Sequence, residues 1–169
     1  VMNIIHGQGG GVSHAIGVGG RDLSAQVGGS TMLQALELLE ADAETRVIGL
    51  ISKPPAPATA RKIFERLRAC KKPAVIQFIH CPPELAAESG AQVSAGFEET
   101  ALRCLALAQG KPYTPESADE RLARLSPLAR KAAAGMATEQ RYLRGLYCGG
   151  SLAEETLEIA QGVLGPMYG

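Results

Sequence analysis

Two glycine-rich stretches that each follow a short apolar run are well suited to bind an anion. Glycines at the end of a strand let a ligand approach the main chain, and the free N–H groups of a following helix favour negative charge. An arginine in such a loop can grip a carboxylate or phosphate through two N–H groups. The candidate residues are Gly17, Gly19, Gly20 and Arg21 in the first stretch, and Gly149, Gly150 and Ser151 in the second.

Both stretches also have an ordinary structural interpretation. The first can be a glycine-rich turn in which Arg21 and Asp22 form a solvated ion pair. The second can be a strand-to-helix turn, with Ser151 as the N-cap and Glu154 completing a capping box. The carboxylates of Glu154 and Glu155 would then complement the positive end of that helix without any ligand.

Lys53 and His80 are the candidate catalytic side chains. Lys53 follows the apolar run at residues 47–51, so its ammonium can reach the same crevice as Arg21. His80 follows a second apolar run and has the near-neutral pKa of a general acid or base. Its neighbour Cys81 points to the opposite face of an extended chain, which argues against a nucleophile–base pair. A solvated lysine and a histidine that ends a strand are the alternatives.

Alternating strand and helix patterns position these residues. Continuous apolar runs such as residues 47–51 are typical of parallel strands that are covered on both faces. Parallel strands need crossover helices, so the pattern predicts an α/β fold with a doubly wound parallel sheet. The predicted strands are residues 12–16, 47–51 and 74–79, and the predicted helices begin near Ser30 or Thr31 and span residues 58–70 and 97–109.

The rest of the chain suggests an interior piece of a larger protein. Residues 1–6 resemble the last turns of a helix that should follow a strand, and residues 142–148 and 152–160 predict a new strand and helix. Ser117 and Glu120 form a capping box at the start of a helical linker. We expect an α/β domain without its first strand at residues 1–110, a helical linker at 111–137, and the truncated start of a second, similar domain at 138–169.

Composition excludes several classes of partner. Seventeen basic and 17 acidic residues leave no net charge, and aromatic residues make up only 4% of the chain, so we expect no nucleic-acid binding. No apolar run approaches the roughly 20 residues that span a bilayer, so we expect no membrane partner. The scattered cysteines predict reduced thiols, a cytoplasmic protein and no metal site; they are Cys70, Cys81, Cys104 and Cys148.

The segment at residues 10–24 resembles the FdrA family, whose members look like fused subunits of succinyl-CoA synthetase and are labelled acyl-CoA synthetases. Its Ser-His-Ala-Ile-Gly core followed by Gly-Gly-Arg-Asp is more specific than a lone glycine motif. The similarity continues through residues 51–55 and resumes at 143–152. The resemblance implies that residues 1–110 are a flavodoxin-like α-type ligase domain and that residues 138–169 open a β-type domain.

The same resemblance implies a phosphohistidine between two facing helix N-termini, one of which matches the helix that begins at Ser151. The superfamily carries that histidine in a Gly-His-Ala-Gly loop after the last long strand. Residues 80–92 contain no such motif, and His80 lies earlier, at the strand end.

Three functions follow from the residues and the resemblance. The first is an acyl-CoA synthetase-like ligase subunit that binds acyl or phosphate anions between two α/β domains, with CoA and a nucleotide with Mg bound through the rest of the protein. The second is a carbamoyltransferase component of purine (allantoin or oxamate) breakdown, which uses carbamoyl phosphate without a phosphohistidine. The third is a non-catalytic scaffold. We expect a homo-oligomer or a multi-subunit complex.

Overall fold

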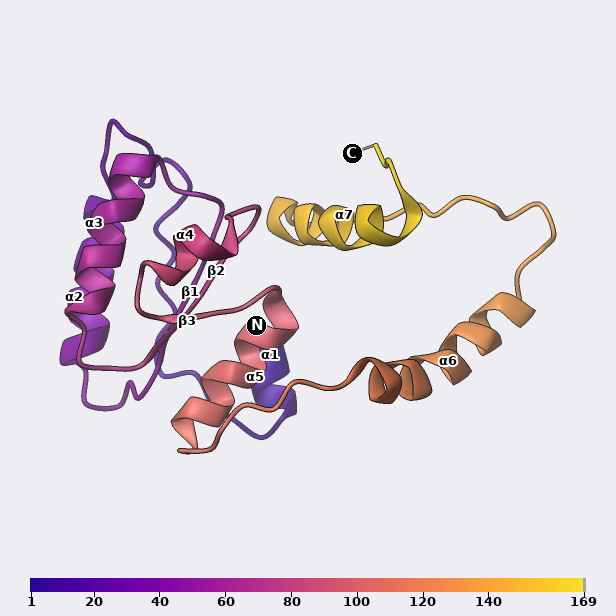
Figure 1. The fold of residues 1–169 in the computed structure, drawn as a ribbon, viewed down its shortest axis with the longest axis horizontal. Helices are drawn as coiled ribbons and strands as arrows, with labels where there is room; N and C mark the ends of the chain where they lie inside the picture. The colour runs from indigo at the N-terminus through magenta and orange to yellow at the C-terminus, as the bar shows by residue number, and fades with distance from the viewer. Residues whose placement is uncertain (169) are drawn as a thin grey trace. The chain divides into compact units, whose positions relative to one another are not determined.

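The computed structural model describes residues 1–168, which divide into two compact units (Figure 1). One unit contains Val1–Tyr113 and the segment from Gly149 onwards; the other is Thr114–Cys148. No helix within residues 1–168 is both long and apolar enough to cross a bilayer. The elements are α1 (Met2–Gly7), α2 (Ser30–Ala41), β1 (Ile48–Ser52), α3 (Pro57–Arg68), β2 (Ala74–Phe78), α4 (Pro83–Ala87), β3 (Gln92–Val93), α5 (Phe97–Ala108), α6 (Ala118–Ala134) and α7 (Gly150–Leu164).

A parallel sheet of three strands, in the order β1-β2-β3, forms the centre of the larger unit. β1 pairs with β2 from Ile48 opposite Ala74 to Ser52 opposite Phe78. This pairing confirms an α/β fold with parallel strands at the two long apolar runs. β3 and the short helix α4 lie where the sequence analysis expected only a loop, because elements this short have no clear periodicity.

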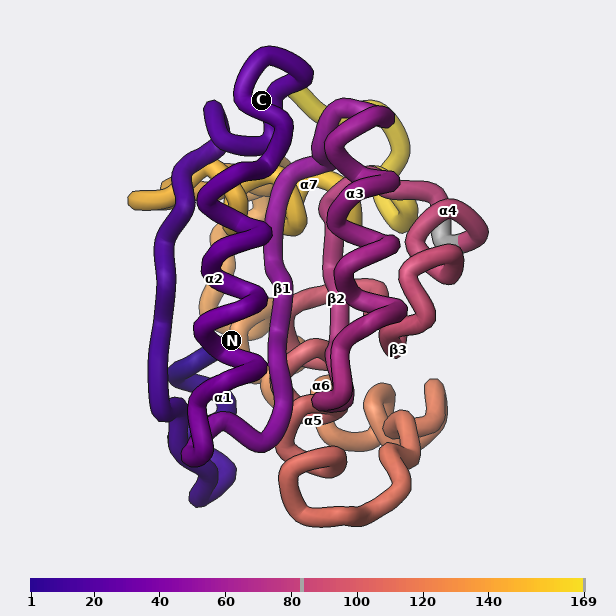
Figure 2. Tube along the Cα trace, turned by 90° about the vertical axis from the view of Figure 1, so that its left-hand side faces the viewer, coloured from indigo at the N-terminus to yellow at the C-terminus, as the bar shows by residue number. Residues whose placement is uncertain are grey.

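Helices cover both faces of the sheet. All five residues of β2 are buried, and successive side chains of a strand point to opposite faces. Ile76 therefore packs in one core cluster with Leu36 of α2 and Phe64 of α3, whereas Val75 packs in another with Ile5 of α1. α5 contributes Ala101 and Cys104 to this second cluster. Figure 2 shows α2 and α3 in front of the strands, with α5 behind them.

Two predicted strands are absent from the described residues. Residues 12–16 run as an extended segment but do not pair in the sheet, and residues 142–148 form neither strand nor helix before α7. Both predictions were wrong for the same reason: an extended run becomes a strand only beside a partner that supplies hydrogen bonds. In the linker region, by contrast, the predicted capping box of Ser117 and Glu120 is confirmed at the start of α6.

Asp22 caps the N-terminus of α2 from eight residues away. The predicted caps, Ser30 and Thr31, do not fill this role; the N-cap is Gly29, in the left-handed region with a φ of 77°. Asp22 Oδ1 accepts a hydrogen bond from the Thr31 N–H at 2.9 Å, and Oδ2 accepts one from the Met32 N–H at 2.9 Å. The carboxylate thus satisfies two free N–H groups and places negative charge at the positive end of the helix.

These contacts lower the pKa of Asp22. Burial of the side chain acts to raise the pKa, but the N–H groups of Thr31 and Met32 and the hydroxyls of Thr31 and Ser30 together outweigh it. Because the folded pKa lies below the ordinary value of 3.8, the stabilisation by Asp22 is present above pH 3.8 and is lost as the pH falls through the folded pKa.

We expect Asp22→Ala to lower the free energy of unfolding by about 1–3 kcal/mol, because the N–H groups of Thr31 and Met32 lose their acceptor. Asp119→Ala, at an exposed position in the first turn of α6, is the matched control and should have a much smaller effect. Urea denaturation at neutral pH gives the free energy of unfolding of both variants. Below pH 3.8 the difference in this free energy between wild type and Asp22→Ala should become smaller. Equal destabilisation by the two substitutions would contradict the capping role.

Candidate functional site

A cleft of about 840 Å³ lies between the extended segment at residues 9–20 and strand β1. Its lining includes five of the residues that the sequence analysis chose as anion-binding or catalytic candidates. They are Gly17, Gly19, Gly20, Lys53 and Ser151. The cleft thus brings together glycines of the first loop, the lysine at the end of β1 and the first turn of α7.

The remaining candidates lie outside this lining within residues 1–168. Arg21 is exposed and follows the cleft-lining glycines directly. Gly149 and Gly150 are also exposed: Gly149 is the N-cap of α7, and Gly150 is its first residue. The predicted N-cap and capping box were wrong, because Gly149 and not Ser151 is the N-cap of α7 and no side-chain cap hydrogen bond is present.

Three carboxylates on one face of α7 contact residues that follow β1, follow β2 or begin α5. Glu154 Oε1 lies 2.5 Å from Lys53 Nζ, directly after β1. Glu158 Oε2 lies 3.6 Å from Nδ1 of His80, which follows β2. Between them, Glu155 Oε1 accepts a hydrogen bond of 2.5 Å from the Phe97 N–H at the start of α5. The helix therefore sets its own negative charges at the edge where ligands of parallel sheets bind.

The Glu155 contact requires close approach to the main chain. Gly96 leaves room for it, because a Cβ at this position would lie 2.6 Å from Glu155 Oε1. Burial raises the pKa of Glu155, although the bond from the Phe97 N–H acts in the opposite direction. The Glu155 carboxylate thus caps α5, and its partial burial disfavours the charged form.

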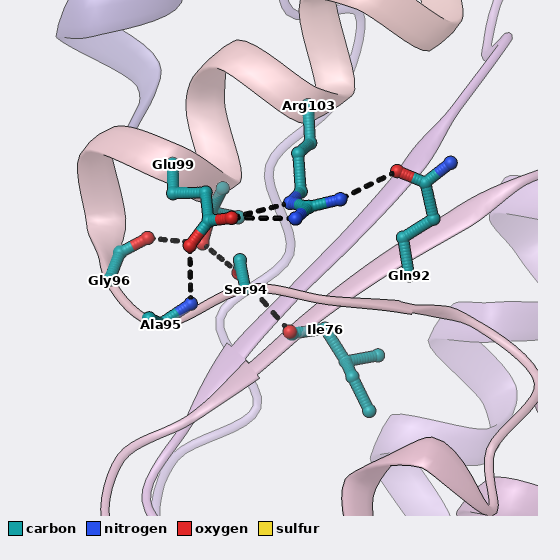
Figure 3. A network of polar contacts seen from close by, with 8 residues as sticks. Ile76, Gln92, Ser94, Ala95, Gly96, Glu99 and Arg103 are labelled. Carbon is teal, nitrogen blue, oxygen red and sulfur yellow. Dashed lines mark hydrogen bonds and ion pairs between the residues drawn. The ribbon is translucent and has the colours of Figure 1, made fainter. Parts of the chain in front are cut away.

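A hydrogen-bond network holds the start of α5 in position (Figure 3). The Ser94 N–H and hydroxyl both donate to the Ile76 carbonyl of β2, at 3.0 and 3.2 Å. Glu99 Oε2 accepts from the Ala95 N–H at 2.8 Å, and its Oε1 accepts from Arg103 Nε at 2.8 Å. Protein carboxylates thus occupy two N–H groups at the beginning of α5, those of Ala95 and Phe97.

His80 lies in the turn that ends β2 and has a positive φ of 60°. Its side chain is half exposed, and its Nδ1 lies 3.6 Å from Glu158 Oε2. Burial raises the pKa of the neighbouring Cys81 thiol, so Cys81 is not an activated thiolate nucleophile. The described contact of the His80 ring is therefore with Glu158, and not with Cys81 as a nucleophile–base pair.

The acidic face of α7 is a feature of the candidate site that the sequence analysis missed. Residues 154, 155 and 158 have the i, i+1 and i+4 spacing of one helix face, which was the available signal. The sequence analysis treated Glu154 and Glu155 only as complements of their own helix dipole. Among residues 1–168, no group of three or more His, Cys, Asp or Glu side chains has an arrangement that could hold a metal ion.

Comparison with known proteins finds a relative that aligns with nearly the whole chain. No protein-family model matches the chain. The chain is 44% identical over 164 residues to the uncharacterized protein YahF of Escherichia coli (strain K12). The alignment covers 97% of this chain but only 31% of YahF, so the chain spans about a third of the length of this relative.

We expect Glu155→Gln to keep α7 in place and Glu155→Ala to release it. Glutamine keeps an oxygen that accepts the Phe97 N–H without a buried charge, whereas alanine leaves that N–H without an acceptor, at a cost of about 1–3 kcal/mol. Hydrogen exchange at the Phe97 amide and protease cleavage of α7 report the docking.

The pH dependence gives a second readout for the same contact. Because the folded pKa of Glu155 lies above its ordinary value of 4.5, docking is strongest below pH 4.5 and weakens as the pH rises through the folded pKa. Glu155→Gln should remove this dependence. An exchange rate at Phe97 that is unchanged in Glu155→Ala would show that the contact does not hold the helix.

Proposed function

We propose that the chain is part of an acyl-CoA synthetase-like ligase subunit of the FdrA type, with a doubly wound, flavodoxin-like sheet. In this proposal an acyl or phosphate anion binds at the carboxyl edge of the sheet, between two α/β domains. The observation that carries the proposal is the shared cleft: Gly19, Gly20, Lys53 and Ser151, chosen from separate parts of the sequence, line one cavity.

The chemistry of that lining suits an acyl phosphate. Gly19 has a positive φ of 72°, which turns the main chain where the first loop meets the cleft. Main-chain N–H groups and the Lys53 ammonium can stabilise negative charge on a phosphoryl or acyl-phosphate group as it develops. CoA and a nucleotide with Mg would bind through parts of the protein beyond this chain, in a homo-oligomer or a multi-subunit complex.

Glu154 acts in this proposal as an internal competitor for the anion. Its carboxylate neutralises Lys53 at 2.5 Å, so a phosphate that binds Lys53 has to displace it. Both side chains are partly exposed, and exchange of one carboxylate for another anion therefore costs little. The ion pair would keep the lysine oriented towards the cleft until the ligand arrives.

We expect Glu154→Gln to tighten binding of inorganic phosphate by up to about five-fold, since an exposed ion pair contributes about 0.2–1 kcal/mol. Lys53→Met should weaken the same binding, because it removes the cation. Lys111→Met, at an exposed lysine after α5, is the control and should leave affinity unchanged. Isothermal titration calorimetry measures all three; a Lys53→Met variant with wild-type affinity would remove Lys53 from the site.

One observation favours the second candidate, a carbamoyltransferase component. The helix α4 (Pro83–Ala87) lies where the resemblance implies a glycine-rich histidine loop, and His80 is paired with Glu158 instead. Carbamoyl transfer between an amide acid and phosphate needs anion sites between domains but no phosphohistidine. The carboxyl end of the cleft, beside Lys53, would then hold carbamoyl phosphate.

Labelled ATP distinguishes these functions in the full-length protein. A ligase that retains phosphohistidine chemistry should take up an acid-labile label with Mg²⁺, and His80→Asn should abolish the label while His6→Asn, an exposed histidine of α1, leaves it intact. Cleavage of carbamoyl phosphate without such a label would support the carbamoyltransferase. If the protein shows neither activity, and its melting temperature does not change with phosphate, acetyl phosphate or carbamoyl phosphate, a non-catalytic scaffold would be the remaining function.

A further inference from the structure

The cleft has two extended walls that run in the same direction. Ser13 Oγ lies 3.0 Å from Thr45 Oγ1, just before β1, and the Leu23 carbonyl accepts a 2.9 Å hydrogen bond from the Ala56 N–H, after β1. The first wall therefore runs from the amino end of β1 to its carboxyl end, parallel to the strand. In Figure 2 this segment is the indigo trace beyond α2, on the side of β1 away from β2.

The other wall is the open edge of β1. The Ile48 N–H donates to the Pro73 carbonyl, and the Ser52 carbonyl accepts from the Ile79 N–H. Main-chain groups of alternate strand residues point to opposite sides, so those of Gly49 and Ile51 point away from β2. Both residues line the cleft. The cleft therefore faces a row of main-chain donors and acceptors with the spacing of a strand edge.

Crossover handedness says which part of the chain belongs there. Crossovers between parallel strands are right-handed in about 98% of cases. α2 connects the extended segment to β1, and α3 connects β1 to β2. Both helices lie on the same face, so both crossovers move across the sheet in the same direction. α1 lies on the opposite face with α5, so a right-handed crossover through α1 must proceed in the other direction. A strand that precedes α1 then falls between the extended segment and β1.

We propose that the cleft holds a parallel β-strand, formed by polypeptide that precedes Val1 in the longer protein. This strand would hydrogen-bond to Gly49 and Ile51 on one side and to the extended segment on the other. Its side chains would be apolar on both faces, because Met32 and Leu36 line the cleft from the α2 face while Ile5 and Cys104 line it from the α5 face. The proposal assigns a place to the strand that the sequence analysis expected before residue 1.

Element lengths place the strand within the preceding polypeptide. A strand of five residues, as long as β1, spans about 16 Å. A helix that returns over this distance needs about 11 residues, of which α1 supplies six. About five helical residues and a loop of about two to six residues therefore separate the strand from Val1. In the relative YahF, most of the sequence lies outside the alignment, which is more polypeptide than such a strand, loop and half-helix need.

Photo-cross-linking in the full-length protein tests the identity of the occupant. Benzoylphenylalanine replaces Ile16, which lines the cleft and is 43% exposed, or Leu38, a 65% exposed residue of α2 outside the lining, as the control. We expect a cross-link from position 16 but not from position 38, within a single copy of the protein. The cross-linked peptide should be apolar and should end about 7–11 residues before Val1. A cross-link to a second copy, or a yield at position 16 no higher than at position 38, would overturn the proposal.

Hydrogen exchange on the unmodified protein gives an independent readout. In the full-length protein the Gly49 and Ile51 amides should exchange about 100-fold more slowly than in the isolated 169-residue chain, since a paired amide exchanges only through local opening. The Ile48 amide, which bonds to Pro73 in either case, is the internal control. Equal exchange of Gly49 and Ile51 in the two proteins, with Ile48 protected in both, would show that no strand occupies the cleft.

Discussion

Parallel pairing of β1 with β2 is the constraint on which the rest of the structure depends. Because the two strands point the same way, their carboxyl ends meet at one edge. Lys53 and His80 follow these ends directly, and the start of α5 lies beside them through the bonds of Ser94 to β2. Residues that are 27 positions apart in sequence, such as Lys53 and His80, thereby share one side of the molecule with α7.

Carboxylates of the larger unit accept hydrogen bonds from main-chain N–H groups at the beginnings of two helices. Asp22 satisfies those of α2, and Glu99 and Glu155 satisfy those at the start of α5. Anions are stabilised at such positions, and here the protein's own carboxylates supply the negative charge. Under the proposed function, a phosphate at the cleft would have to compete with Glu154 for Lys53.

The proposed strand and the proposed anion site reinforce one another. After the carboxyl end of the proposed strand, the chain would continue to α1 on one face of the sheet. After the carboxyl end of the neighbouring β1, it continues to α3 on the other face. Such a divergence is a topological switch point, where open α/β sheets form a crevice for ligands. Lys53, at the end of β1, would then lie at the mouth of that crevice.

Local patterns by themselves determined the buried strands β1 and β2, the helices α3 and α5, and the capping box of Ser117 and Glu120, because each depends on neighbours within a few residues. Tertiary structure decided the rest. Residues 12–16 have the pattern of a strand but no partner beside them, and Asp22 and Glu155 look like solvated charges until folding brings them to Met32 and Phe97. A hydrogen bond between residues 58 positions apart leaves no periodic trace in a sequence, since only the packed sheet brings its donor and acceptor together.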